Sequence, residues 1–323
     1  MRIDIVGGGA IGLLHAAMLA QVHPNTTVWT RTQSQAAWLR SEGIKLIDQI
    51  GMAQNVSIDS HSLEESCELH NSGRVTPHWV ILTVKQSHID DALMDGLARL
   101  LTKESSLLCL QNGIGHLEKL EGRLHTPNLY AGVTSIGARR LEVGTVQCTG
   151  RGELWFGPAH QIHNSEKPSN LDQKKDCVQK MLINVLELAG FSAFMSNQMK
   201  DRIYQKLLVN AVINPLTAIF DVTNGELPKN PARRRLMRAL YEETVSILAA
   251  DGMKEAEEGW ERILQVCEST SLNISSMLSD VRAERVTEID WINGGVASIA
   301  RRKEIPSLLN DSVSAIVQRL ARE

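Results

Sequence analysis

Short runs of apolar, β-branched residues alternate with helical patterns through the first half of the chain. This alternation is typical of a parallel α/β sheet. Between the first two runs, an Ala-, Leu- and Met-rich segment at about Ile11–Val22 predicts a helix. The predicted strands are Arg2–Val6, Thr26–Trp29, Trp79–Val84, Leu107–Leu110 and Leu129–Val133.

Residues 144–157 contain two further strand patterns joined by a glycine-containing turn. We expect this hairpin to add antiparallel strands at the far edge of the sheet. The polar stretch from Pro158 to Asp172 predicts a surface loop. A helix near 172–189 and a short strand at Phe191–Met195 would complete the domain.

Strand patterns stop near residue 197, and helical periodicity continues to the C-terminus. A chain of 323 residues is long for one hydrophobic core. We therefore expect an α/β domain over residues 1–196 and an all-α domain over residues 197–323. The predicted helices of the second domain lie near 198–213, 230–250, 254–268, 276–301 and 308–321.

Composition narrows the class of protein. The formal net charge is −3, so the chain carries no excess of positive charge to hold nucleic acid or an anionic membrane. Five scattered cysteines without a C-x-x-C pair favour reduced thiols and predict no metal site. No basic leader or apolar run long enough to span a bilayer is evident, which favours a cytoplasmic location and no membrane partner.

A G-x-G-x-x-G motif follows the first predicted strand directly and opens the first helix. In this context the glycines allow a tight turn and a close approach to a pyrophosphate, while the helix N-terminus offers amide donors. We therefore predict an α/β Rossmann-type dinucleotide-binding domain followed by an all-α C-terminal domain. The motif comprises Gly7, Gly8, Gly9, Ala10, Ile11 and Gly12.

The ends of later strands also carry polar residues. Arg31 follows the second strand, where an NAD-binding protein would place an acid, so the sequence favours NADP(H) over NAD(H). The alternative is a surface arginine. Lys85 ends the third strand and Asn112 follows the fourth, although Asn before Gly is also ordinary turn chemistry.

In the second half, Lys206, Asn210 and Asn214 recur every fourth residue inside an apolar segment. This spacing places all three on one stripe of a helix, which Pro215 is expected to kink or end. Buried polar groups are costly without partners, so a polar ligand would explain the stripe. The alternative is that these side chains satisfy carbonyls of a neighbouring element.

Two further segments allow a structural or a functional interpretation. Residues Asn273–Ser276 precede an apolar pair and resemble a helix start, so capping is one role for Asn273 and the two serines. Glu288 lies in a charge-rich run that the residues alone would assign to a solvated face. A nicotinamide domain beside a buried lysine nonetheless suggests carbonyl reduction, with the ammonium stabilising and protonating the oxygen.

Several long blocks together resemble the ketopantoate reductase (2-dehydropantoate 2-reductase) family. The resemblance covers most of the chain, from Gly7 to about Gly294, with consistent order and spacing. It implies NADPH-dependent reduction of ketopantoate in pantothenate biosynthesis by a cytoplasmic monomer or homodimer. The blocks that carry it are Lys206–Ile219, Asn224–Leu227, Asn273–Leu278 and Thr287–Gly294.

The resemblance also implies roles for individual residues. Lys206 would be the general acid, and Glu288 would lie near it and the nicotinamide ribose, against the solvated-face interpretation. Besides the glycine motif, the cofactor contacts would be Arg31, Lys85, Asn112, Ala138 and Glu288. Substrate contacts would come from Lys206, Asn210, Asn214, Asn224, Asn273, Ile274, Ser275 and Ser276, with Ser276 suited to the carboxylate.

One departure from the family concerns the adenine side of the cofactor. Some members carry a glutamine three residues after the strand-end lysine, where this chain has His88. Two alternatives to ketopantoate reduction remain open from the sequence. One is a reductase of the same fold acting on another branched 2-oxo acid, and the other is a protein that senses NADP(H) without turnover.

Overall fold

A computed structural model describes residues 1–66, 77–124, 128–159, 172–254 and 258–320. The chain forms two compact units. The first comprises Met1–Gln111 and His116–Met199, and the second comprises Asn112–Gly115 and Lys200–Glu323. The predicted fold class, a parallel-rich α/β unit followed by a helical one, is confirmed. The domain boundary between residues 196 and 197 stays a prediction.

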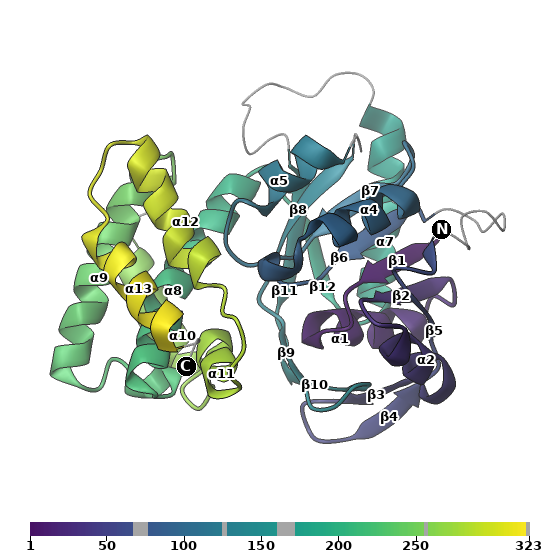
Figure 1. Ribbon diagram of the computed structural model, residues 1–323, viewed down its shortest axis with the longest axis horizontal. Coiled ribbons are helices and arrows are strands. Elements are labelled where there is room, and N and C mark those ends of the chain that lie inside the picture. The colour runs from purple at the N-terminus through teal and green to yellow at the C-terminus, as the bar shows by residue number, and fades with distance from the viewer. Residues whose placement is uncertain (67–76, 125–127, 160–171, 255–257, 321–323) are drawn as a thin grey trace. The chain divides into compact units, whose positions relative to one another are not determined.

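A large sheet forms the centre of the first unit, with the strand order β12-β11-β8-β7-β6-β1-β2-β5 (Figure 1). Neighbours from β8 to β5 are parallel, while β11 runs antiparallel to β8 and parallel to β12. The strands are β1 (Ile3–Val6), β2 (Thr26–Thr30), β5 (Asp59–Ser62), β6 (Trp79–Leu82), β7 (Ser106–Cys109), β8 (Leu129–Thr134), β11 (Glu153–Pro158) and β12 (Ser192–Met195).

Helices of the first unit begin where local capping favours them. Thr32 and Asp90 accept hydrogen bonds from the amides of Gln35 and Leu93, which caps the second and fourth helices. The first helix begins after Gly9 without any side-chain cap. The helical segments are α1 (Ala10–Ala20), α2 (Gln33–Glu42), η1 (Gln86–His88), α4 (Asp91–Leu100), α5 (His116–Arg123) and α7 (Asp172–Leu188).

A second, four-stranded sheet has the order β4-β3-β10-β9 and packs against α1, which also contacts β1 and β2 of the large sheet (Figure 1). Its strands are β3 (Ile44–Ile47), β4 (Ala53–Val56), β9 (Gly137–Arg140) and β10 (Thr145–Gly150). The hairpin predicted over residues 144–157 is therefore wrong. Strand β10 pairs with β3 and β9, and β11 crosses into the large sheet. Most of the loop predicted from Pro158 to Asp172 lies outside the described residues.

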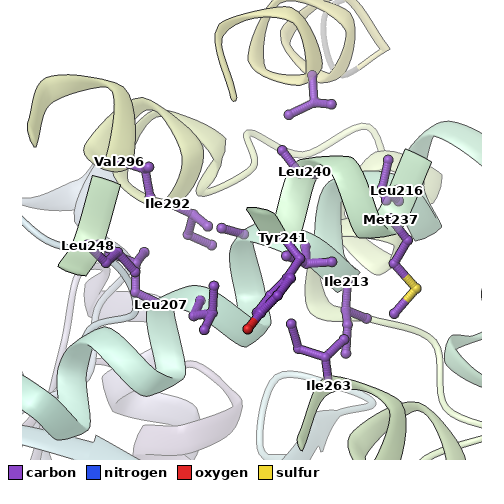
Figure 2. Packing of buried hydrophobic residues seen from close by; sticks show 14 of the residues in the cluster. Leu207, Ile213, Leu216, Met237, Leu240, Tyr241, Leu248, Ile263, Ile292 and Val296 are labelled. Carbon is purple, nitrogen blue, oxygen red and sulfur yellow. The ribbon is translucent and has the colours of Figure 1, made fainter. Parts of the chain in front are cut away.

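The second unit is helical and packs its apolar side chains into one core (Figure 2). Leu207, Ile213 and Leu216 contribute from α8, while Leu240 and Ile292 contribute from α9 and α12, and all five are almost fully buried. The helical segments are α8 (Met199–Phe220), η2 (Asn224–Glu226), α9 (Pro231–Ala250), α10 (Gly259–Ser269), α11 (Ser276–Arg282), α12 (Ile289–Arg302) and α13 (Leu308–Leu320).

Helix α8 corrects the expectation that no apolar segment is long enough to cross a bilayer. Its 22 residues pass that test by length and composition, and 61% of its most apolar window is buried within the protein. A buried core helix passes the same test, and α8 supplies much of the core just described. Cytoplasmic location stays a prediction.

Helix α8 also continues through Pro215 to Phe220, so the prediction that it stops near residue 213 is wrong. Proline lacks an N–H and leaves the carbonyl four residues earlier, that of Ala211, without its helical donor. Asn293 of α12 supplies the replacement, because its Nδ2 donates to the Ala211 oxygen at 2.8 Å. The fully buried Asn293 also donates to Asn310 Oδ1 at 2.9 Å.

The single helix predicted over residues 276–301 is two helices. Ala283 caps α11, and Glu284 adopts a left-handed backbone with φ of 52°. The Arg285 amide then donates to the Asp280 carbonyl at 2.8 Å, a bond that closes a helix C-terminus. As a result, Glu288 lies at the start of α12 rather than in the middle of a helix.

We predict that Asn293→Ala destabilises the protein by about 2–3 kcal/mol, because it leaves the buried Ala211 carbonyl without a donor and removes one hydrogen bond to Asn310. Pro215→Ala in that background should recover part of the loss, since an alanine N–H satisfies the Ala211 carbonyl. Urea denaturation of wild type, both single variants and the double variant measures the coupling. Strictly additive losses would contradict the compensating role of Asn293.

Candidate functional site

The turn after β1 has the geometry of a phosphate cradle. Gly7 has φ of +127°, which disfavours any side chain, and a Cβ on Gly12 would lie 1.9 Å from the Gly7 carbonyl oxygen. A Cβ on Gly9, in contrast, would meet no atom within 4 Å. Two glycines are thus required by the protein's own packing, and the third borders open space.

Several backbone amides at this turn have no acceptor among the described residues. The first hydrogen bond of α1 runs from the Leu13 amide to the Gly9 carbonyl. The preceding amides of Gly9, Ala10 and Ile11 donate to no residue in the described part of the chain. The first turn of α1 also contains no acidic residue. An anion from outside the chain fits these donors, as the pyrophosphate of a dinucleotide would.

Cations flank this turn on the two neighbouring strands, since β6 and β2 pair with β1 on either side. Arg31 is exposed one residue after β2, and Lys85 lies three residues after β6. Burial lowers the pKa of His88, and the charges of Arg31 and Lys85 lower it further. All three side chains are therefore close enough to interact. Ala138 lies in β9, partly buried.

In the second unit, Lys206 and Asn210 are partly buried on α8 and Asn214 is buried. Burial lowers the pKa of Lys206 to about 8, opposed by the negative charge of Glu288. The side-chain amides of Asn210 and Asn214 form no hydrogen bond to any residue that the structure describes. The alternative that these two amides satisfy a neighbouring element is therefore not what the structure shows.

Glu288 is 7% exposed at the N-terminus of α12, where the helix dipole favours a carboxylate. The solvated-face interpretation of Glu288 is wrong. Asn112 Nδ2 donates to Glu288 Oε2 at 3.0 Å. The segment that carries Asn112 is fixed against α12, because Ile114 N donates to Trp291 O and a Cβ on Gly113 would lie 2.4 Å from that oxygen. Gly113 has φ of +78°, so the Asn-Gly turn and the Glu288 contact coexist.

The side-chain amide of Asn224 is buried, and only its nitrogen has a hydrogen-bond partner among the described residues. Its Nδ2 donates to Thr270 Oγ1 at 2.9 Å, and its backbone amide donates to the Asn273 carbonyl. The Asn224 Oδ1 atom is buried with no partner among the described residues. A ligand hydroxyl would satisfy it.

Ser275 has the capping role that the sequence left open. Its Oγ accepts from the Leu278 amide at 3.1 Å and lies 2.8 Å from Thr217 Oγ1 of α8. In both bonds the Ser275 oxygen accepts, and together they fix α11 to α8. The neighbouring Asn273, Ile274 and Ser276 are exposed.

Three polar residues near the first site were not singled out from the sequence. Gln111 donates to the carbonyls of Leu82 and Val84 at 3.0 Å, joining the ends of β6 and β7. Gln35 and Arg140 both donate to the Gly8 carbonyl. Gln111 had a local sequence signal, because it directly follows a buried strand. Within the described ranges no cluster of three His, Cys, Asp or Glu residues could hold a metal.

These features define a dinucleotide-binding α/β protein with a helical second unit. Residues 3–161 match the family described as ketopantoate reductase PanE/ApbA, and residues 198–321 match its C-terminal counterpart. The chain belongs to the ketopantoate reductase family, and the prediction of an oxidoreductase is confirmed at this level.

Individual relatives agree with this assignment. A 2-dehydropantoate 2-reductase of Bacillus subtilis (strain 168) is 32% identical over 91% of this chain and 89% of its own length. A crystal structure of a probable 2-dehydropantoate 2-reductase from Bacillus subtilis is 30% identical, covers 99% of this chain and 100% of its own, and has a TM-score of 0.79. The structure of a D-mandelate dehydrogenase with NADH and anilino(oxo)acetate is 23% identical, covers 99% of this chain and 98% of its own, and has a TM-score of 0.85. At this identity the likeness shows only that the two proteins share a fold.

Substitutions at two glycines of this turn can distinguish a loss of packing from a loss of ligand binding. Gly12→Ala should lower stability by about 3 kcal/mol, because its methyl overlaps backbone. Gly9→Ala should cost no more than about 1 kcal/mol, yet weaken NADPH binding, since its methyl enters the open space. Thermal melts and NADPH titration of both variants check this. A Gly9→Ala variant that binds as wild type would place the phosphates elsewhere.

Proposed function

We propose that the protein catalyses the NADPH-dependent reduction of 2-dehydropantoate to (R)-pantoate. The observation that carries the proposal is the polar group of Lys206, Glu288 and Asn112 in the helical unit of a ketopantoate reductase family member. The relatives that this chain resembles are 2-dehydropantoate 2-reductases, and the proposed substrate is taken from them. The proposed binding partner is therefore its small-molecule substrate, a 2-oxo acid. Whether the protein is a monomer or a homodimer stays a prediction.

The proposed cofactor site combines the glycine turn with the flanking cations. The amides at the start of α1 would hold the pyrophosphate, and Arg31 with Lys85 would favour the additional phosphate of NADPH over NADH. When bound, the cofactor supplies the hydride. The contacts assigned to it are Gly7, Gly8, Gly9, Ala10, Ile11, Gly12, Arg31, Lys85, Asn112, Ala138 and Glu288.

Lys206 is the proposed general acid. A pKa of about 8 keeps the ammonium mostly protonated at neutral pH while making its proton easier to release than that of an exposed lysine. The ammonium would stabilise the negative charge that grows on the ketone oxygen and then protonate it. Such a positioned acid typically contributes about 10²–10⁴-fold to the rate.

Glu288 and Asn112 keep that acid charged and in place. Burial alone would lower the pKa of Lys206 further, and the negative charge of Glu288 opposes this. Asn112 fixes one carboxylate oxygen through its amide hydrogen. The carboxylate therefore has one oxygen anchored, which limits its rotation near the ammonium.

The remaining polar groups suit a substrate with a carboxylate and hydroxyl groups. Asn210 and Asn214 extend the Lys206 face of α8, and the Asn224 Oδ1 atom needs a donor. Asn273, Ile274 and Ser276 would contact the carboxylate end, with Ser276 at the first position of α11. Ser275 contributes by holding this segment against α8.

The direct test is NADPH oxidation with ketopantoate, an aryl 2-oxo acid and other branched 2-oxo acids. Ketopantoate should give the highest kcat/KM, and NADPH should be preferred to NADH. Lys206→Ala should lose about 10²-fold or more in kcat while still binding NADPH. Lys200→Ala, which removes a cation from the same helix, should retain activity.

Preference for another acid would identify a different reductase, and NADPH binding without turnover on any acid would identify a sensor. Wild-type kcat in Lys206→Ala would remove the lysine from the chemistry.

The pH dependence of kcat/KM tests the electrostatic interaction between Lys206 and Glu288. Reduction needs protonated Lys206, so kcat/KM should fall as pH rises through about 8. Glu288→Gln removes the charge that raises the pKa of Lys206, so this fall should move to lower pH by about one unit or more. Asp290→Asn, an exposed carboxylate on the same helix, is the matched control and should leave the profile unchanged. An unmoved profile in Glu288→Gln would contradict the electrostatic role of Glu288.

A further inference from the structure

The carbonyl of Gly8, in the middle of the glycine turn, is held by two side chains from distant parts of the chain. Gln35 Nε2 of α2 donates to it at 2.9 Å, and a guanidinium nitrogen of Arg140 in β9 donates at 3.0 Å. A carbonyl oxygen has two lone pairs, so these two donors saturate it. This carbonyl therefore cannot rotate without breaking two hydrogen bonds.

Gln35 is itself fixed by the small sheet. The second hydrogen bond of Nε2 goes to the carbonyl of Val143 at 3.1 Å, in the turn between β9 and β10. Both partners are acceptors, which fixes the orientation of the amide. The Gln35 amide also covers Gly8 closely, because a Cβ on Gly8 would lie 2.6 Å from both its Nε2 and its Oε1.

The orientation of the Gly8 carbonyl determines the direction of the next N–H. In a planar trans peptide the carbonyl oxygen and the following amide hydrogen point in opposite directions. With the Gly8 oxygen held toward Gln35 and Arg140, the Gly9 N–H points away from them. That amide donates to no described residue, and it precedes the first turn of α1, where anions bind.

We propose that Gln35 and Arg140 are positioning residues that lock the Gly8–Gly9 peptide so that the Gly9 amide donates to the cofactor pyrophosphate. This inference rests on the dinucleotide site of the proposed function. It also gives the small sheet a role, because β9 and the β9–β10 turn provide Arg140 and the Val143 anchor. Pyrophosphate is common to NADPH and NADH, so the lock acts equally on both, unlike Arg31.

Equilibrium binding of NADPH and NADH, followed by fluorescence or calorimetry, tests the lock. Gln35→Ala and Arg140→Met should each raise both dissociation constants about tenfold and leave their ratio unchanged. Arg140→Lys, which keeps a donor, should retain most of the affinity. Arg139→Met is the matched control, since it removes the same charge from the adjacent position of β9, which faces the opposite way. Arg31→Ala should instead change the ratio.

Gly8→Ala provides an independent check. Its methyl group would displace the Gln35 amide, so it should weaken binding about as much as Gln35→Ala. The double variant should be no worse than either single variant, because both remove the same hydrogen bond. Additive losses would overturn the proposed route through Gln35.

A measurement without cofactor separates positioning from direct contact. With ¹⁵N-glycine labelling, the Gly9 amide should show a lower order parameter in Gln35→Ala than in wild type. An unchanged order parameter, or wild-type affinity in Gln35→Ala, would overturn the lock. A changed NADPH/NADH ratio in Arg140→Met would show that Arg140 contacts the ribose phosphate instead. Failure of the wild-type chain to bind either dinucleotide would overturn the proposed function as well.

Discussion

Burial of the Lys206 ammonium is the constraint on which the second unit depends. Taking an ammonium out of water is costly, and the protein must either let it lose its proton or surround it with compensating groups. Here burial has the larger effect and lowers the pKa of Lys206 to about 8, while the negative charge of Glu288 limits the fall. The balance leaves a cation that is present at neutral pH and can release a proton, which the proposed reaction requires.

That balance depends on how α8 and α12 are joined. The joint is the hydrogen bond from Asn293 to the Ala211 carbonyl, which Pro215 makes available. This bond connects the helix that carries Lys206 to the helix that begins at Glu288. A proline in a core helix thus creates an acceptor that specifies one packing of the neighbouring helix. Asn112 then anchors the carboxylate from a third segment.

The sequence predicted those features whose signals are local. The glycine turn after β1, the lysine and asparagine stripe of α8 and the helical second unit all follow from spacing within a few turns. The small sheet did not, because β3 and β4 are short and β3 pairs with β10, about a hundred residues later. The local signals for the β3–β4 turn were Gly51, with φ of +88°, and Asp48, whose side chain accepts from the amides of Ile50 and Met52.

Other errors have the same physical origin. The end of α11 is set by Glu284 in a left-handed conformation, where glycine would have been the usual signal. The passage of α8 through Pro215 depends on Asn293, which lies far away in sequence. Burial of Glu288 could be inferred only by resemblance, since its neighbours Arg282, Glu284 and Arg285 are exposed. Where tertiary contacts decide, a pattern in one segment is not sufficient.

The two units address opposite electrostatic problems in the same manner. In the proposed cofactor site, the first would bind an anion with backbone amides and flanking cations rather than with a buried charge. The second must retain a buried cation. In each, the group beside the acting one is held by a residue from a distant element: the Gly8 carbonyl by Arg140, and the Glu288 carboxylate by Asn112. Orientation that is fixed before the ligand arrives lowers the cost of ordering these groups on binding. A protein that only sensed the dinucleotide would need the first of these arrangements, but not a proton donor tuned by a carboxylate.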